Sequence, residues 1–382
     1  MKVLHLINTL RAGGAEVNVV RLAQYADRTR VRPHLAYCGT WPLEAAVIEA
    51  EVPTFHLDSV PRRVKSLATP FIIARLTSYL RKHKIDLVHT HLFNAHAWGA
   101  VAARLAGVKV LEHVHDHRYT DRAILIKRGL AETRQYDRAR YFARLSDRIV
   151  VLTNQNRNYV LDRVGIAAAK VSVIPNGLAP RAMLPNREDR AALRHQLGVP
   201  GDAIVLLAAG RLADEKNFTV LITALEALSS EIPRLYTLIL GEGPELAALQ
   251  TQIDRAGLGN ICRLLGHKTD IQSYYDIADI FVQPSIFELQ SLAMLEAMQA
   301  RLPVVVSEGV GCNDDLIRHG ESGFLVHPNQ PKLWMQTIWA LAHDPGLRTR
   351  VGENGKAIVD SQCDIRQVSQ RFEALYEEIC ST

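Results

Sequence analysis

The sequence predicts an α/β protein with two doubly wound, Rossmann-like domains, each a mostly parallel sheet covered by helices on both faces. The 382 residues are too many for one typical hydrophobic core. Short apolar strands alternate with amphipathic helices, and this alternation stops near residue 180 and restarts near residue 203. The charge balance changes at the same place: residues 1–180 hold 27 Lys and Arg against 14 Asp and Glu, whereas residues 181–382 hold 18 against 26.

The first half opens with a strand, a glycine-containing loop and a helix, which is the first unit of a doubly wound sheet. The loop carries Gly13 and Gly14 but neither a G-x-G-x-x-G nor a Walker A sequence. On its own it indicates only that the backbone can approach a ligand or a facing domain closely. The strands expected here are residues 2–8, 34–38, 53–57, 86–91, 108–117, 148–153 and 171–177, and the helices are 43–51, 66–84 and 95–106, with a basic helical segment at 117–148.

Asn176-Gly177, Pro180 and Pro185 mark the end of the first half. Residues 180–200 are polar and either irregular or weakly helical. Because the second half repeats the pattern of the first, we expect two similar sheets that face each other, with ligands beyond the carboxyl ends of the strands. The strands expected here are residues 203–210, 235–243, 261–266, 279–284, 303–308 and 323–326, and the helices are 217–228, 245–256, 271–277, 291–299, 331–343, 346–359 and 365–379.

Composition argues against a disordered chain, a membrane-spanning protein and a disulfide-stabilised secreted protein. Hydrophobic residues make up 48% of the chain and charged residues 22%, which are values of a folded globular protein. No run of 18 apolar residues is present, and the N-terminal run VLHLI is too short for a signal peptide. The five cysteines are scattered singly, which argues against a disulfide framework and favours a reducing cytoplasm.

The stretch from Gln283 to Ala300 carries the most informative polar pattern. Glu288 precedes an amphipathic helix, Glu296 lies inside it, and Ser291 is a candidate N-cap, so free backbone N–H groups should cluster near residues 289–293. Such amides can bind the anionic part of a phosphorylated ligand while the carboxylates take hydroxyls. The alternative is an ordinary surface helix with two solvated glutamates.

Other strand ends are polar too. Arg211 and Lys216 follow one strand and could converge on a diphosphate, although the pair alone could also be surface charge. Gly241 and Lys268 follow two further strands. Histidines gather at the ends of two strands in the first half, at positions 89, 91, 96, 113 and 115. Because no Cys or carboxylate stands beside them in a standard zinc spacing, we expect no metal site and one histidine as a polar contact to substrate.

These features belong to a longer pattern, and the chain resembles glycosyltransferase family 4, retaining nucleotide-sugar-dependent enzymes of the GT-B fold. The resemblance implies two facing Rossmann-like domains with an interdomain cleft. It is looser in the N-terminal half. It is carried by GGAE at 13–16, GVKVLEHVHD at 107–116, VIPNGL at 173–178, GRLADEKN at 210–217, LGEGPE at 240–245, LLGHKTDI at 264–271, DIFVQPSIFELQSLAMLEAM at 279–298, PVVVSEGVG at 303–311 and GESGFLV at 320–326.

The resemblance also implies roles for single residues. Arg211 and Lys216 match the basic pair that binds the donor pyrophosphate. Glu288 matches the carboxylate near the donor sugar, and His115 matches the histidine that contacts this sugar. These four form the expected catalytic set. The expected donor-binding set is Gly13, Gly14, Arg211, Lys216, Gly241, Lys268, Glu288, Leu289, Gln290, Ser291, Leu292 and Glu296, with Glu296 on the ribose and the main chain near Lys268 at the base.

One departure concerns the two residues after Glu288. Many family members carry glycine there, whereas this chain reads Leu289-Gln290. Leucine at 289 requires backbone angles that a non-glycine residue can adopt. A glutamine side chain could contact sugar hydroxyls, so we interpret the change as tuning of the donor, with an inactive scaffold as the alternative.

The resemblance implies three segments: an acceptor-binding domain at 1–178, a nucleotide-sugar-binding domain at 179–363, and a C-terminal helix at 364–382 that packs back on the first domain. It implies a metal-independent hexosyl- or N-acetylhexosaminyltransferase. The donor is expected to be a UDP-sugar first and a GDP-sugar second.

The basic first half could face nucleic acid, anionic lipid or a phosphorylated substrate, or its charges could simply solvate helix faces. We expect a glycan or lipid-linked saccharide acceptor, such as a lipopolysaccharide core, reached at an anionic membrane surface through 62–65 and 117–148. The protein should then work in the cytoplasm at the inner face of the membrane. The alternatives are a nucleotide-sugar epimerase, a nucleic-acid-binding protein, for which no motif is present, and a non-catalytic GT-B protein.

Overall fold

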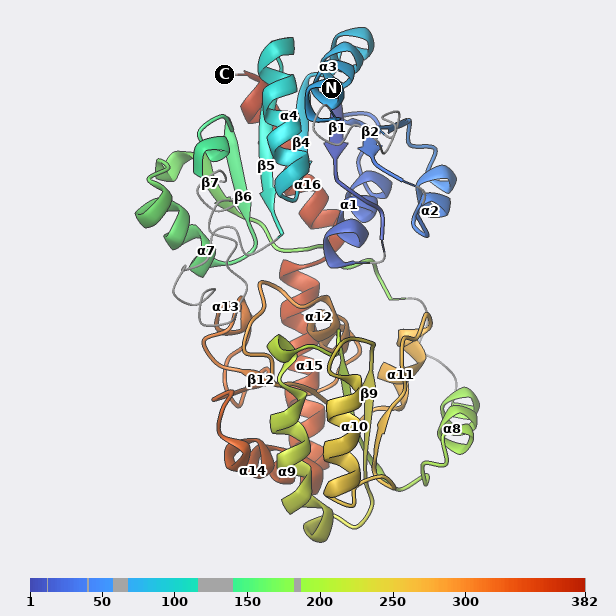
Figure 1. Ribbon diagram of the computed structural model, residues 1–382. Coiled ribbons are helices and arrows are strands. Elements are labelled where there is room, and N and C mark those ends of the chain that lie inside the picture. Colours follow the sequence, from blue (N-terminus) through green and yellow to red (C-terminus); the bar gives the residue numbers. More distant parts are fainter. Residues whose placement is uncertain (12, 40, 58–67, 116–139, 182–186, 382) are drawn as a thin grey trace. The chain divides into compact units, whose positions relative to one another are not determined.

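The computed structural model describes residues 1–11, 13–39, 41–57, 68–115, 140–181 and 187–381 (Figure 1). The chain divides into two compact units: unit 1 consists of Met1–Ala179 and Cys363–Thr382, and unit 2 of Pro180–Gln362. Each unit contains one parallel sheet, as the sequence predicts. The segment 62–65 and most of 117–148, which we expected at a membrane surface, lie outside the described residues.

Unit 1 is built on a seven-stranded parallel sheet of order β3-β2-β1-β4-β5-β6-β7. The chain starts in the middle of the sheet and winds outward in both directions, so the crossovers cover both faces. The strands are β1 (Lys2–Leu6), β2 (Arg32–Tyr37), β3 (Thr54–His56), β4 (Leu87–His91), β5 (Lys109–Val114), β6 (Arg148–Val151) and β7 (Val171–Val173). Among the described residues before 180, the helices are α1 (Gly14–Gln24), α2 (Glu44–Glu49), α3 (Ala68–His83), α4 (Phe93–Ala106) and α7 (Asn154–Tyr159), with a π-helical turn at Val160–Val164.

The last helix, α16 (Ile365–Ser381), belongs to unit 1. Its Phe372 packs in one buried cluster with Val3 of β1 and Leu111 of β5. The backbone ties its start to the end of the first half: the N–H of Leu178 donates to the carbonyl of Cys363 at 2.7 Å. In Figure 1 the red ribbon of α16 accordingly lies among the blue and green elements of unit 1. The C-terminus thus completes the hydrophobic core of the N-terminal sheet.

Unit 2 contains a six-stranded parallel sheet of order β10-β9-β8-β11-β12-β13. The winding reverses between β8 and β11, and ligands of open α/β sheets bind at the carboxyl ends of strands at such a point. The strands are β8 (Ile204–Ala209), β9 (Leu235–Leu240), β10 (Cys262–Leu264), β11 (Ile280–Gln283), β12 (Val304–Ser307) and β13 (Phe324–Val326), and the helices are α8 (Arg187–Gln196), α9 (Phe218–Glu231), α10 (Leu246–Arg255), α11 (Ile271–Ile277), α12 (Leu292–Gln299), α13 (Asn313–Leu316), α14 (Pro331–His343) and α15 (Pro345–Gln362).

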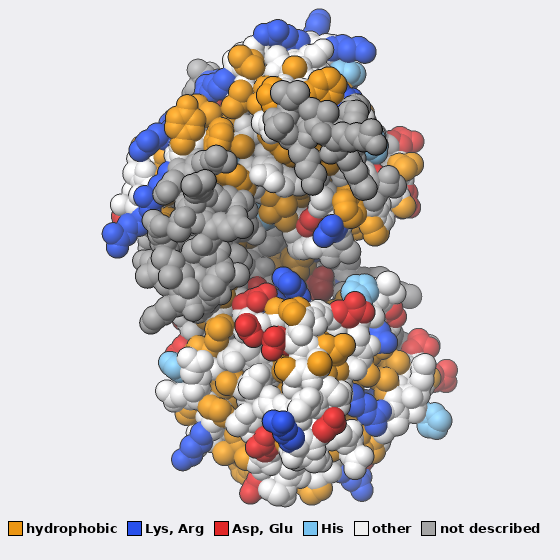
Figure 2. Space-filling view, in the orientation of Figure 1, with side chains coloured by type: hydrophobic (Ala, Val, Ile, Leu, Met, Phe, Trp, Pro, Cys, Tyr) orange, Lys and Arg blue, Asp and Glu red, His pale blue; other side chains and the backbone are white. Residues whose placement is uncertain are grey.

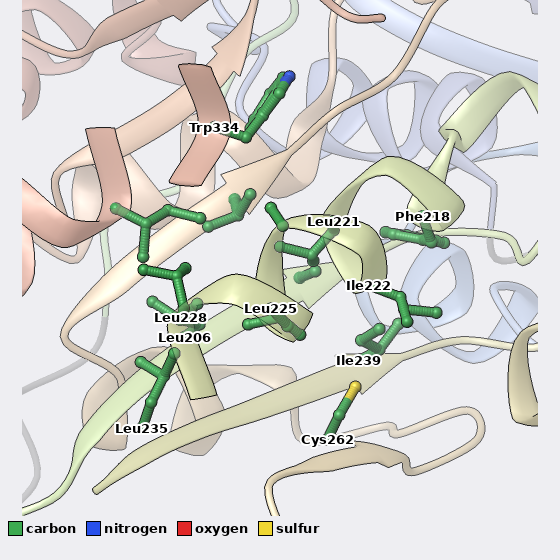
Figure 3. Packing of buried hydrophobic residues seen from close by; sticks show 14 of the residues in the cluster. Leu206, Phe218, Leu221, Ile222, Leu225, Leu228, Leu235, Ile239, Cys262 and Trp334 are labelled. Carbon is green, nitrogen blue, oxygen red and sulfur yellow. The ribbon is translucent and has the colours of Figure 1, made fainter. Parts of the chain in front are cut away.

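The core of unit 2 lies where α9 and α14 cover the sheet (Figure 3). Leu221 and Leu225 of α9 pack against Leu206 of β8 with no exposed surface. Trp334 of α14 is equally buried, and its indole N–H donates to the carbonyl of His327 at 3.0 Å. The strands read as continuous apolar runs because both faces of a parallel sheet are covered. This rigid sheet fixes where each strand ends.

The surface charge follows the two units. On the visible face in Figure 2, Lys and Arg are the more frequent charges of unit 1, whereas Asp and Glu are prominent on unit 2. Within the described part of the chain, no helix combines the length and apolarity that crossing a bilayer requires.

Replacing Phe372 tests whether α16 is part of the core of unit 1. Phe372→Ala should lower the free energy of unfolding by about 3–5 kcal/mol, because it removes a buried aromatic ring and leaves a cavity. Chemical denaturation followed by circular dichroism measures this loss. Gln370→Ala, on the exposed side of the same helix, is the matched control and should change it by less than about 0.5 kcal/mol. Equal stability of the two variants would contradict the packing of this helix.

Candidate active site at the strand ends of unit 2

Glu288 lies in the loop after β11, and three side chains converge on one of its oxygens. The ammonium of Lys216 pairs with Oε1. The amide of Gln283 donates to the same oxygen at 2.9 Å, and the hydroxyl of Ser285 donates to it at 3.2 Å. The Glu288 and Lys216 side chains are only 13% and 17% exposed. Among the hydrogen bonds of the described residues none uses Oε2, so the carboxylate is held through one oxygen and can offer the other to a ligand.

Lys216 ends a short 3₁₀ helix (Asp214–Lys216) in the loop after β8. The carbonyl of Glu215 accepts the N–H of Ile286 at 2.9 Å, which joins this loop to the loop that carries Glu288. Strands β8 and β11 are neighbours, so their carboxyl ends lie side by side. Arg211, at the start of the β8 loop, is exposed. The structure therefore brings Lys216 and Glu288 into contact and places Arg211 in the same loop as Lys216.

Helix α12 begins beside this ion pair. The hydroxyl of Ser291 accepts the N–H of Met294 at 3.3 Å, which confirms Ser291 as the N-cap. Among the described residues, no acceptor pairs with the N–H of Leu292 or Ala293. Unpaired N–H groups and the helix dipole make such an N-terminus attractive to a phosphate or another anion.

Glu296 lies inside α12 and is held by Tyr275, which sequence analysis missed. The Tyr275 hydroxyl lies 3.3 Å from Oε2 of Glu296 and 3.1 Å from the carbonyl of Ala293. Burial, and then the neighbouring Glu296 carboxylate, hold the pKa of Tyr275 well above its usual value. The hydroxyl thus stays protonated and donates. Gln283 and Ser285 were missed in the same way, because their spacing from Glu288 shows nothing until the loop is folded.

A close approach of backbones shapes the sheet edge beside Arg211. Gly241 follows β9 with φ of +138°, and a Cβ there would lie 1.8 Å from the carbonyl oxygen of Gly210. The N–H of Gly241 also donates to the carbonyl of Gly266 at 2.9 Å. Lys268, two residues after Gly266, is exposed. Only glycine permits this packing of three strand ends.

The departure at Leu289-Gln290 is compatible with the fold. Leu289 has no left-handed φ, so the leucine adopts ordinary backbone angles, as the sequence required. Its carbonyl accepts the N–H of Cys312 at 2.9 Å. Both Leu289 and Gln290 are buried. The loop after Glu288 is thus packed into unit 2 rather than left open.

The remaining predicted residues lie in unit 1. His115 directly follows β5, and its Nε2 lies 3.0 Å from Nδ1 of His91. Gly13 is the N-cap residue of α1 and Gly14 its first residue. A Cβ on Gly13 would lie 2.5 Å from Oε2 of Glu16, so this position is also tightly packed. The predicted site residues are therefore divided between the two units.

The strand ends of unit 2 can bind an anion and hydroxyl groups at once. A cation and open helix amides suit a diphosphate, and two fixed carboxylates suit sugar hydroxyls. This is the chemistry that a nucleotide-sugar requires.

Comparison with known proteins agrees with this geometry. The protein is a glycosyltransferase of the GT-B fold. Residues 12–182 match the model of Glycosyltransferase Family 4, and residues 189–358 match that of Glycosyl transferases group 1. Together these matches span most of both units, and the chain belongs to the family 4 glycosyltransferases.

Two curated relatives illustrate the family. The chain is 28% identical to the UDP-Gal:alpha-D-GlcNAc-diphosphoundecaprenol alpha-1,3-galactosyltransferase of Escherichia coli, over 78% of this chain and 77% of the relative. It is 27% identical to a D-inositol 3-phosphate glycosyltransferase of Streptomyces scabiei, over 94% of this chain and 85% of the relative.

Among solved structures, HepE of Anabaena with UDP and glucose has a TM-score of 0.85 at 23% identity and 99% coverage of both chains. Sucrose-phosphate synthase of Thermosynechococcus elongatus has a TM-score of 0.82 at 20% identity, over 100% and 99%.

Gly241→Ala tests the close approach at the strand ends. The added Cβ would clash with the carbonyl of Gly210, and alanine is strained at a positive φ. The free energy of unfolding should therefore fall by about 2–5 kcal/mol. Gly259→Ala is the matched control, because nothing lies within 4 Å of a Cβ there. Thermal unfolding measures both variants. A Gly241→Ala protein as stable as the control would show that the strand ends do not pack in this way.

Proposed function

We propose that the protein is a retaining glycosyltransferase that moves a hexosyl or N-acetylhexosaminyl group from a UDP-sugar to a saccharide or lipid-linked saccharide. The single observation behind this proposal is the arrangement at Glu288. Its Oε1 is fixed by Lys216, Gln283 and Ser285 beside the open N-terminus of α12. The cation and the free helix amides suit a diphosphate, and the carboxylate beside them suits the sugar attached to it.

UDP is the proposed nucleotide because of the relatives. HepE of Anabaena, which shares the fold, was solved with UDP and with UDP-glucose. The galactosyltransferase of Escherichia coli is named for UDP-Gal. The main chain near Lys268 would meet the base, and Glu296, held by Tyr275, would bind the ribose hydroxyls. Gly241 would let the backbone approach the nucleotide closely.

The proposed chemistry needs no metal at the pyrophosphate. Arg211, Lys216 and the N–H groups of Leu292 and Ala293 would neutralise the charge that develops as the nucleoside diphosphate leaves. Oε2 of Glu288 would accept a hydrogen bond from a sugar hydroxyl near the reacting carbon. Attack and departure on the same face of the sugar would retain the configuration.

On the side of unit 1, His115 would contact the donor sugar and the loop at Gly13 and Gly14 would approach the diphosphate. The acceptor would bind to unit 1, which carries the basic charge. A lipid-linked acceptor is favoured by the Escherichia coli relative, whose named acceptor is a diphosphoundecaprenol. Contact with an anionic membrane through 62–65 and 117–148, at the cytoplasmic face, would bring the enzyme to such a substrate.

A second acceptor class has its own support. The Streptomyces relative is named as a D-inositol 3-phosphate glycosyltransferase, and a basic unit 1 also suits a small phosphorylated polyol. A screen of donors against lipid-linked and phosphorylated polyol acceptors, read as UDP release, separates the two. If no combination of donor and acceptor releases UDP, that result contradicts the proposed function.

Glu288→Gln tests the role of the free carboxylate oxygen. Glutamine keeps a carbonyl for Lys216, Gln283 and Ser285 and replaces the oxygen that faces the sugar. We expect kcat to fall by at least about 100-fold while the affinity for UDP changes by less than about 3-fold. Steady-state UDP release and calorimetric titration measure the two quantities.

The matched control for this variant is Glu226→Ala, which removes an exposed carboxylate from α9. It should retain both turnover and UDP affinity. Turnover by Glu288→Gln at the level of this control would contradict the assignment of Glu288 to the sugar.

A further inference from the structure

Five histidines lie together in unit 1, on one face of three neighbouring strands. His5 of β1 pairs in register with His89 of β4, and His91 of β4 pairs with His113 of β5. His115 follows at the end of β5. Alternate residues of a strand point to the same face, which explains why these side chains meet. Four of the five are buried and His115 is half-buried, so the group runs from the sheet edge into the core.

The hydrogen bonds within this group leave Nε2 of His89 and both ring nitrogens of His113 unpaired among the described residues. Nδ1 of His5 lies 3.3 Å from Nε2 of His91, and Nδ1 of His91 lies 3.0 Å from Nε2 of His115. Both ring nitrogens of His113 are buried and, among the described residues, have no partner. Its ring lies 3.9 Å from that of His115, centroid to centroid. A buried imidazole without a partner is costly, and a ligand at its lone pair removes this cost.

The distances fit one ion. The nitrogens that His91, His113 and His115 can offer all lie within 4.8 Å of one another. Zn–N bonds of about 2.0–2.1 Å in a tetrahedral site place two ligating nitrogens about 3.3 Å apart, close to the 3.0 Å between His91 and His115. We propose that His91, His113 and His115 form a binding site for one transition-metal ion of the class that imidazole prefers, with Zn²⁺ or Co²⁺ as the test ions.

In this site the ion takes the place of the proton that His91 and His115 share, and His113 swings its unpaired nitrogen toward them. His5 holds the ring of His91 from the opposite side, as partners of metal-bound histidines commonly do. Three protein ligands leave a fourth position for water or hydroxide, and half-buried His115 provides the way in. The ligands come from two strands, so no sequence spacing reveals them, and our expectation of no metal rested on spacing alone.

The site shares His115 with the proposed transfer reaction, which otherwise uses the charges of unit 2, so metal binding is measured directly and not through turnover. It is tested with the tag-free full chain, stripped with a chelator and titrated with ZnCl₂ by calorimetry and with CoCl₂ by visible absorption. We expect one equivalent to bind, a rise in Tm, and the intense visible bands of cobalt in a tetrahedral nitrogen site. No saturable uptake of either ion would overturn the proposal.

Two variants locate the ligands. His113→Leu and His115→Ala should each weaken zinc binding by at least about 100-fold and abolish the cobalt bands. His34→Leu is the matched control, because His34 is also buried in this sheet but bonds to Tyr79 at 2.9 Å, outside the group. It should bind zinc like the wild type. If all three variants bind zinc with the affinity of the wild type, the ion binds elsewhere and the proposal is wrong.

A stability measurement separates loss of the site from loss of the fold. Without metal, His113→Leu should keep or raise the Tm, because it replaces two unpartnered nitrogens by an apolar side chain of similar size. With zinc, the wild type should gain Tm and the variant should not. If His113→Leu does not fold, the half-exposed His115→Ala decides alone: retained cobalt bands in that variant would reject the site.

Discussion

The contact between Lys216 and Glu288 is the interaction on which the rest of the site depends. It joins the loops after β8 and β11, the two strands between which the winding of the unit 2 sheet reverses. Partly buried charges are expensive, and this pair persists because Gln283 and Ser285 donate to the same carboxylate oxygen. The cation is thereby kept beside the amides of α12, where a diphosphate can be bound without first ordering the loops.

The glycines explain why the strand ends can come so close. A side chain at Gly241 would meet the backbone of Gly210, and one at Gly311 would meet the carbonyl of Leu289 at 2.4 Å. The second contact fixes the loop that carries Glu288. Leucine and glutamine at 289 and 290 are tolerated in this loop because neither residue adopts a left-handed φ. Sequence variation after Glu288 therefore alters the lining of the site without loosening its frame.

The sequence predicted the parallel sheets, the N-cap Ser291 and the positions of Glu288 and Glu296 before and inside α12, because each depends on local pattern. It did not predict the partners Gln283, Ser285 and Tyr275, whose roles exist only after distant segments meet. It also did not predict α7, because its residues NQNRNY show no apolar residues repeating at helical spacing. That helix starts because the Thr153 hydroxyl accepts the N–H of Asn156 at 3.0 Å. The histidines of unit 1 were visible as an alternating pattern, but only strand pairing shows that His91 lies beside His113.

Calorimetric titration of UDP into the wild-type chain tests most directly whether the strand ends of unit 2 form a nucleotide-sugar site. We expect one-to-one binding that Lys216→Ala weakens by about 10-fold or more, with folding of the variant confirmed by circular dichroism. Absence of binding by UDP and by other nucleoside diphosphates would contradict a nucleotide-sugar site here, as would equal affinity in the folded Lys216→Ala protein.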